Sequence, residues 1–263
     1  MKNRSSRTLP YLCGTVLLIG ACCADRQTAE TAGRFPAAPD TATEHRAADS
    51  AAGASESFRV GRPTARKLDS MGYVDIRDVD PDIAVEIRYA TACNFTGEVL
   101  YDDLDEAFML PETARRLAEA QRALRELHPS FRLVVYDAAR PFAVQRRMWR
   151  IASARGKSYY VANPAKGGGL HNYGAAVDVS VLDGNGVALP MGTEYDCFNA
   201  AAHTDRERDL VGQGIISREQ LDNRLLLRSV MTGAGFRPVA SEWWHFNLCS
   251  REEARKKYRL IDF

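Results

Sequence analysis

The sequence predicts an α+β fold in which a central, largely antiparallel sheet is flanked by helices. Segments with helical spacing and segments of strand-like composition are grouped apart, without the strand–helix–strand alternation that builds a parallel sheet. In addition, the turn sequence Asp183-Gly184-Asn185-Gly186 follows the most clearly alternating strand and is typical of an antiparallel hairpin. These two observations together favour antiparallel pairing.

The predicted strands are short and rich in β-branched or aromatic residues. In chain order they cover residues 71–75, 84–89, 131–136, 177–181, 236–238 and 243–248. The strand at 177–181 is the clearest, because its valines alternate with Asp178 and Ser180, the repeat of a half-buried strand. Asp178 should therefore point away from the core that the valines enter.

Three helices are predicted from the spacing of apolar residues. They cover residues 111–127, 141–154 and 218–231. Pro111 suits the first turn of the first helix, where the backbone N–H has no partner within the helix. Ser217 and Gln220 form the sequence pattern of a capping box at the start of the third helix.

Residues 1–22 resemble a bacterial lipoprotein signal peptide. Basic residues near the N-terminus precede a short apolar run at 12–21, too short to cross a bilayer comfortably. The run ends in Ile19-Gly20-Ala21-Cys22, which is similar to a lipobox. We therefore expect export to the periplasm or cell surface and a lipid anchor at Cys22. An ordinary signal peptide cleaved nearby is the alternative.

The remaining chain divides into a tether and a domain. Residues 23–65 are predicted to be disordered, because small and polar residues dominate and large aliphatic side chains are almost absent. Residues 66–263 are long enough to form a hydrophobic core without disulfide support and are predicted to be the enzymatic domain. The formal net charge of +1 gives no support for nucleic-acid binding.

Candidate metal ligands lie around the clearest strand. A glycine-rich loop, residues 167–174, carries His171 just before Asp178, and its glycines allow the turns that would bring the two side chains together. The best source of a third ligand is His245, at the end of Glu242-Trp243-Trp244-His245. Two ligands from one segment and one from a distant segment are a common arrangement for an open zinc site. We therefore predict one catalytic zinc ion per chain.

Two further residues suit peptide hydrolysis. Glu242 is a candidate general base and acid, but it lies three positions before His245, so a bend near Ser241 must bring both side chains to one face. Arg140, at the end of a predicted strand, is a candidate donor to the oxyanion of a tetrahedral intermediate. Taken singly, each residue has an ordinary structural alternative, a surface carboxylate or a surface ion pair.

These motifs carry a family resemblance. His171 and Asp178 with six residues between them, followed by Glu242-Trp243-Trp244-His245, resemble the zinc D-Ala-D-Ala dipeptidases of the vancomycin-resistance type, within a broader family of zinc D,D-peptidases. Residues 88–97, 137–141 and 190–196 are similar to further motifs of the family. The resemblance covers nearly the whole predicted domain.

The resemblance implies a role for each matching residue. It implies that His171, Asp178 and His245 bind zinc. Glu242 would be the general base and acid, and Arg140 would stabilise the tetrahedral intermediate. It also implies that Asp196, with Tyr89 nearby, binds the free ammonium group of the substrate.

The sequence departs from the family at two positions. Gly169 stands where serine is frequent, and Ala139 stands where a tyrosine often precedes the arginine. Both positions belong to the end of the site that would bind the substrate carboxylate.

The function predicted from the sequence is hydrolysis of D-Ala-D-Ala to two D-alanines by a zinc metallopeptidase. A zinc D,D-carboxypeptidase that acts on peptidoglycan stem peptides is one alternative; Asp196 favours the dipeptide, because it would pair with a free amine. A non-catalytic zinc-containing cell-wall binding module is the other. The presence of both Glu242 and Arg140 argues against it.

Overall fold

The structure, a computed structural model, describes residues 62–263. The predicted signal peptide and residues 23–61 of the predicted tether lie outside the described residues. The folded part begins before the predicted boundary at residue 66, because helix α2 (Pro63–Ser70) already buries Ala65 and Leu68. No helix within 62–263 has the length and apolar character needed to cross a membrane.

A five-stranded sheet forms the centre of the described part, in the order β2-β4-β5-β7-β6. Its strands are β2 (Ala84–Val85), β4 (Arg132–Asp137), β5 (Ala176–Leu182), β6 (Arg237–Pro238) and β7 (His245–Asn247). The pairs β4–β5, β5–β7 and β6–β7 are antiparallel, and β2 pairs with β4 in parallel. The predicted α+β class with a largely antiparallel sheet is therefore confirmed.

The first two predicted strands are wrong in extent. β1 (Val74–Asp75) lies outside the central sheet and pairs with β3 (Phe108–Met109). It ends at once because the Asp75 side chain accepts a hydrogen bond from Arg77 N and so caps α3 (Ile76–Val79). The predicted strand at 84–89 keeps only β2 and turns into a 3₁₀ helix at Arg88–Ala90.

The long helices agree with the sequence patterns. They are α4 (Pro111–Leu127), α5 (Phe142–Ala154) and α7 (Arg218–Gly233). The predicted capping box at the start of α7 is present, since Ser217 Oγ accepts from Gln220 N at 3.1 Å. Two short helices, α6 (Glu207–Gly212) and α8 (Arg251–Lys257), were not predicted.

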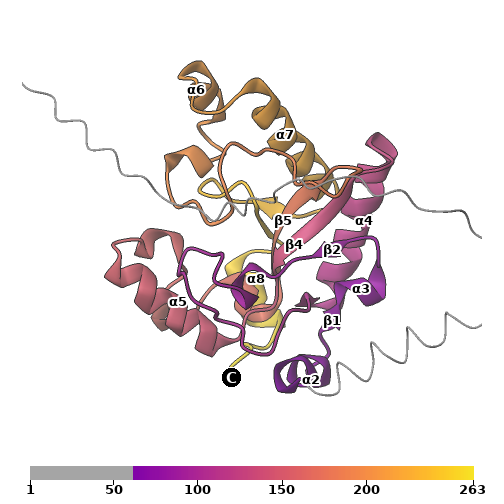
Figure 1. The fold of residues 1–263 in the computed structure, drawn as a ribbon. Helices are drawn as coiled ribbons and strands as arrows, with labels where there is room; N and C mark the ends of the chain where they lie inside the picture. Colours follow the sequence, from indigo (N-terminus) through magenta and orange to yellow (C-terminus); the bar gives the residue numbers. More distant parts are fainter. Residues whose placement is uncertain (1–61) are drawn as a thin grey trace, which may run out of the picture. The chain divides into compact units, whose positions relative to one another are not determined.

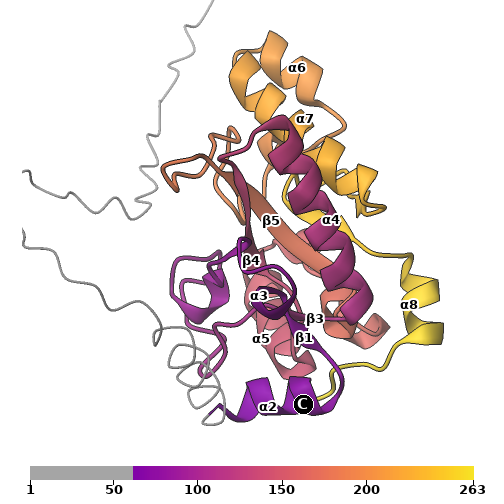
Figure 2. The same cartoon turned by 90° about the vertical axis from the view of Figure 1, so that its right-hand side faces the viewer.

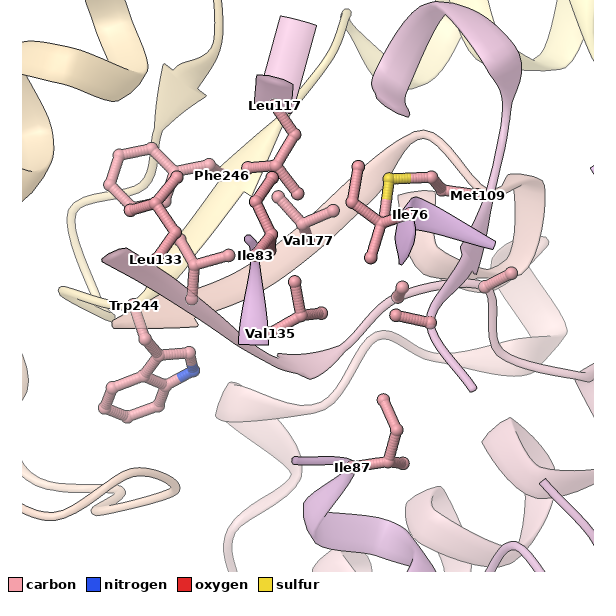
Figure 3. Packing of buried hydrophobic residues seen from close by; sticks show 14 of the residues in the cluster. Ile76, Ile83, Ile87, Met109, Leu117, Leu133, Val135, Val177, Trp244 and Phe246 are labelled. Carbon is pink, nitrogen blue, oxygen red and sulfur yellow. The ribbon is translucent and has the colours of Figure 1, made fainter. Parts of the chain in front are cut away.

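One face of the sheet packs against α4 and α7, which lie beside each other (Figures 1 and 2). The core there is built from large apolar side chains of helix and strands, among them Leu117, Leu133, Val135, Val177 and Phe246 (Figure 3). Burying one such side chain stabilises the fold by about 1.5–3 kcal/mol. The hydrophobic core therefore lies on this face of the sheet, and the polar candidate site residues Asp178 and His245 lie outside it.

The opposite face of β5 is covered as well, so the prediction of a half-buried strand is wrong. All seven residues of β5 are buried, including Asp178 and Ser180. The loop after the predicted hairpin turn passes over Asp178, and the hydroxyl of Tyr195 donates to Asp178 Oδ2 at 3.0 Å. The hairpin itself is confirmed by the antiparallel bridge between Leu182 and Ala188.

Candidate active site

His171 reaches the sheet from a short turn, the 3₁₀ helix Leu170–Tyr173. This turn ends at Gly174, whose φ of 64° is left-handed and whose Cβ, if present, would lie 2.3 Å from Tyr73 Cε1. Backbone conformation and space both require glycine there. His171 O accepts from Arg140 N at 2.9 Å, which fixes the turn beside the end of β4.

Asp178 and His245 are direct cross-strand neighbours on β5 and β7. His245 Nδ1 lies 2.9 Å from Asp178 Oδ1. His171 Nε2 lies 3.1 Å from His245 Nδ1 and 3.2 Å from Asp178 Oδ1. The structure thus brings together the three side chains that the sequence analysis selected as candidate ligands, and they are the group of described residues that could hold a metal ion.

The outer nitrogen of each imidazole faces an oxygen acceptor. His171 Nδ1 lies 2.8 Å from Ala138 O, and His245 Nε2 lies 2.9 Å from Asn247 Oδ1. Because a carbonyl oxygen can only accept, these nitrogens are assigned the protons, and the inner nitrogens present lone pairs. Outer partners of this kind are typical of metal-bound histidines.

The inner atoms fit a small cation. Two lone pairs and a carboxylate oxygen face one another, and a tetrahedral ion with bonds of about 2.0 Å would separate its ligands by about 3.3 Å. Burial alone would raise the pKa of Asp178, but His171 and His245 lower it well below its ordinary value, so the carboxylate is ionised. The donor set therefore suits a divalent metal.

Glu242 lies on the bend that the sequence analysis required. Ser241, Trp243 and Trp244 are bend residues, and β7 begins only at His245. Trp243 and Trp244 are buried in the core and anchor the segment, while Glu242 lines the same cavity as His245. Burial raises the pKa of Glu242 to about 8, partly opposed by His245. A carboxyl group with such a pKa can both accept and donate a proton near neutral pH.

Arg140 is buried and held by neighbours that the sequence analysis did not select. Its Nε donates to Asp137 Oδ2 at 3.0 Å, Nη2 donates to the same oxygen, and Nη1 donates to Gln145 Oε1 at 2.9 Å. Tyr101 in turn donates to Asp137 Oδ1 at 2.7 Å. A guanidinium carries five N–H groups, so two are not used by these contacts, and Arg140 lines the cavity described below.

Asp196 has an unusual backbone conformation. Its φ is 60°, and within residues 62–263 no other residue except glycine has a positive φ. Tyr89 donates to Asp196 Oδ1 at 2.9 Å, and Phe95 N donates to Oδ2 at 3.3 Å. Burial, reinforced by the charge of Asp178, raises the pKa of Asp196 to about 8. A buried carboxyl group held in a strained conformation is a feature of binding sites.

A single cavity of about 230 Å³ joins these groups. The predicted site residues that line it are Tyr89, Arg140, His171, Asp178, Asp196, Glu242 and His245. Pockets for drug-sized ligands occupy roughly 300–1,000 Å³, so this cavity suits a smaller molecule.

A sequence-family model described as D-ala-D-ala dipeptidase matches residues 69–261. The chain belongs to this family. A D-alanyl-D-alanine dipeptidase of Escherichia coli (strain K12) is 32% identical over 183 residues, which cover 68% of this chain and 86% of the relative. The same name is given to relatives from Synechocystis sp. (28% identical, 51% of this chain, 66% of the relative) and Enterococcus faecium (29% identical, 68% of this chain, 92% of the relative).

Membership of this dipeptidase family makes the chain a metal-dependent peptidase. Within residues 62–263, the His171–Asp178–His245 cluster is the group that could hold the metal. The supporting residues Asp137, Tyr195 and Asn247 were missed by sequence reasoning. Each acts through a contact that only the folded chain creates, although all three stand within or beside motifs that the sequence analysis had selected.

Proposed function

We propose that this protein is a zinc metallopeptidase that hydrolyses D-Ala-D-Ala to two D-alanines. The observation that carries the proposal is the convergence of a metal-ligand set, a carboxyl group with a raised pKa and a buried ammonium-binding candidate in one small cavity. The names of the family and of its relatives support the same substrate.

In the proposed mechanism, His171, Asp178 and His245 hold the zinc ion. Zinc, when bound, supplies Lewis-acid activation of the water that attacks the peptide carbonyl. Glu242 takes a proton from the attacking water and delivers it to the leaving amine. Arg140, with its two remaining N–H groups, donates to the oxygen that becomes negative as the tetrahedral intermediate forms.

The ammonium end of the substrate is assigned to Asp196 and Tyr89. A hydrogen bond to a charged group contributes about 1.5–3 kcal/mol, and an N-acylated peptide would lose it and leave Asp196 unpaired. This selectivity favours a free dipeptide over the acylated end of a peptidoglycan stem. The dipeptidase is therefore preferred to the D,D-carboxypeptidase.

We also propose that the protein is exported and anchored through Cys22, with residues 23–61 as the tether. The basic start, the short apolar run and the lipobox-like residues 19–22 support this placement. A Cys22→Ser variant should then leave the membrane fraction of the producing cell. If the variant stays in that fraction, the anchor is elsewhere.

The test is hydrolysis by the purified, zinc-loaded protein of D-Ala-D-Ala, N-acetyl-D-Ala-D-Ala and L-Ala-L-Ala. We expect rapid release of D-alanine from the first substrate alone. Equal cleavage of the acylated substrate would replace the dipeptidase by a D,D-carboxypeptidase. A protein that binds zinc but cleaves none of the three would support a non-catalytic binding module.

A further inference from the structure

A second arginine, Arg251, lines the cavity besides Arg140. Arg140 has three of its N–H groups bound to Asp137 and Gln145. Arg251 is exposed, and within residues 62–263 it has no carboxylate in ion-pair contact. It is therefore a cation at the cavity whose charge no described residue neutralises.

The position of Arg251 is fixed by the start of α8. Ser250 Oγ accepts from Glu253 N at 3.2 Å, and Ser250 N donates to Glu253 Oε2 at 2.8 Å. This reciprocal cap sets the residue at which the helix begins, which is Arg251. The helix also packs through Ala254 against Leu170, next to His171. The guanidinium therefore extends from a well-defined backbone position.

Arg251 and Asp196 both line the cavity that holds the candidate metal ligands, and they belong to different segments of the chain. Asp196 follows Tyr195, whose hydroxyl binds Asp178. His245 binds Asn247, four residues before Arg251, and both residues line the cavity. The cavity therefore carries a carboxyl group and an unneutralised guanidinium in addition to the candidate metal ligands.

A free dipeptide carries the two charges that complement this pair. Its ammonium and carboxylate groups flank the peptide bond, and both lose water in a small cavity, so each needs a partner there. Asp196 is the partner of the ammonium group in the proposed function. Arginine matches a carboxylate through two parallel N–H donors.

We infer that Arg251 binds the C-terminal carboxylate of the dipeptide and so determines specificity for a free C-terminus; the inference rests on the proposed function. Asn247 supplies a second donor, because its side-chain oxygen accepts from His245 and its amide N–H groups remain. Gly169 lines the same cavity and offers no side-chain donor. Recognition of both charges would restrict the substrate to peptides with a free N-terminus and a free C-terminus, and so would limit its length.

The test combines a change in the protein with the matching change in the substrate. The kcat/KM values of wild type, Arg251→Met, Arg251→Lys and Lys256→Met are measured on D-Ala-D-Ala and on its C-terminal amide, at equal zinc content. Lys256 is the control, because it is an exposed cation on the same helix that pairs with Glu252 and does not line the cavity.

The wild type should prefer the acid over the amide by about tenfold or more, as expected for a charged hydrogen bond. Arg251→Met should lose this preference, because its KM should rise much more for the acid than for the amide. Arg251→Lys should retain part of the preference, and Lys256→Met should keep all of it.

Two results overturn the inference while the dipeptidase activity stands. One is an unchanged acid-to-amide ratio in Arg251→Met, and the other is an equal loss on both substrates, which marks a structural role. If the wild type fails to hydrolyse D-Ala-D-Ala, the proposed function falls and this inference falls with it.

Discussion

Replacing Asp196 by asparagine should make the protein more stable and less active. Asp196 is only 8% exposed, and burial together with the charge of Asp178 raises its pKa from 3.8 to about 8. Between about pH 4 and pH 8 the unfolded chain therefore binds fewer protons than the folded protein. Stability falls as the pH rises through this window, because the folded protein must keep a proton that the unfolded chain releases more readily.

The size of the effect follows from these two pKa values. At pH 7, which lies about three units above the ordinary pKa of 3.8, the raised pKa lowers the free energy of unfolding by about 4 kcal/mol, at ~1.4 kcal/mol per pH unit. A bound metal ion offsets the charge of Asp178, so we expect roughly 1–3 kcal/mol in the metal-loaded protein. For a domain of this size, each kcal/mol raises Tm by about 2–4 °C.

Asparagine suits the site in every other respect. Its oxygen can accept from Phe95 N, and its amide can donate to the Tyr89 hydroxyl, which rotates to accept. Asparagine also tolerates the positive φ of this position. The substitution therefore removes the ionisable group with little other change. Because asparagine cannot form the charged hydrogen bond to the substrate ammonium, kcat/KM on D-Ala-D-Ala should fall about 10- to 100-fold.

The assay is thermal unfolding of metal-loaded wild type and Asp196→Asn from pH 4.5 to pH 8, combined with kinetics at pH 7. The gain in Tm should be largest at pH 8 and shrink toward pH 4.5. Glu194→Gln, an exposed neighbour in the same loop, is the control and should show neither effect. Equal Tm values for wild type and Asp196→Asn at pH 8 would refute the charge-burial argument, and unchanged kinetics would remove Asp196 from substrate binding.

Three further predictions test other parts of the site and fold. Glu242→Gln should keep the metal and lower kcat by about 10²–10⁴-fold; normal turnover in a metal-loaded variant would exclude Glu242 as the base. Tyr195→Phe removes the hydrogen bond to Asp178 and should weaken metal binding by about 10- to 100-fold in chelator competition; an unchanged metal Kd would mean that Tyr195 only packs. A protein that begins at residue 60 should keep full activity. A protein that begins at residue 71 should have a lower Tm, because it lacks α2, which buries Ala65 and Leu68. Equal Tm values for the two proteins would show that α2 adds no stability.

The long helices could be predicted because their signals are local. The bounds of α4 agree at both ends with the prediction, because the spacing of its apolar residues and its first-turn proline are both features of the local sequence. The side of β5 that Asp178 occupies could also be predicted, because the alternation of a strand fixes which residues share a face. In these cases, neighbours in the sequence decide the structure.

The short strands and the supporting residues of the site could not be predicted, because distant contacts decide them. Two-residue strands such as β1 and β2 exist only through their partners β3 and β4. Tyr195 and Asp178 are in contact because a loop folds over the sheet, and no repeat of apolar residues in the sequence predicts this contact. The burial of both faces of β5 has the same origin.

The register of β5 links the core to the chemistry. A shift of one residue would exchange the two faces, placing Asp178 among apolar side chains and a valine beside His245. The valines that face α4 and α7 oppose such a shift, because each would lose its burial. The pairing of Asp178 with His245 in the β5–β7 ladder is thus fixed by residues that never touch the substrate. It follows that large-to-small substitutions in this core, for example at Val177, endanger metal binding through the register of the strand as well as through stability.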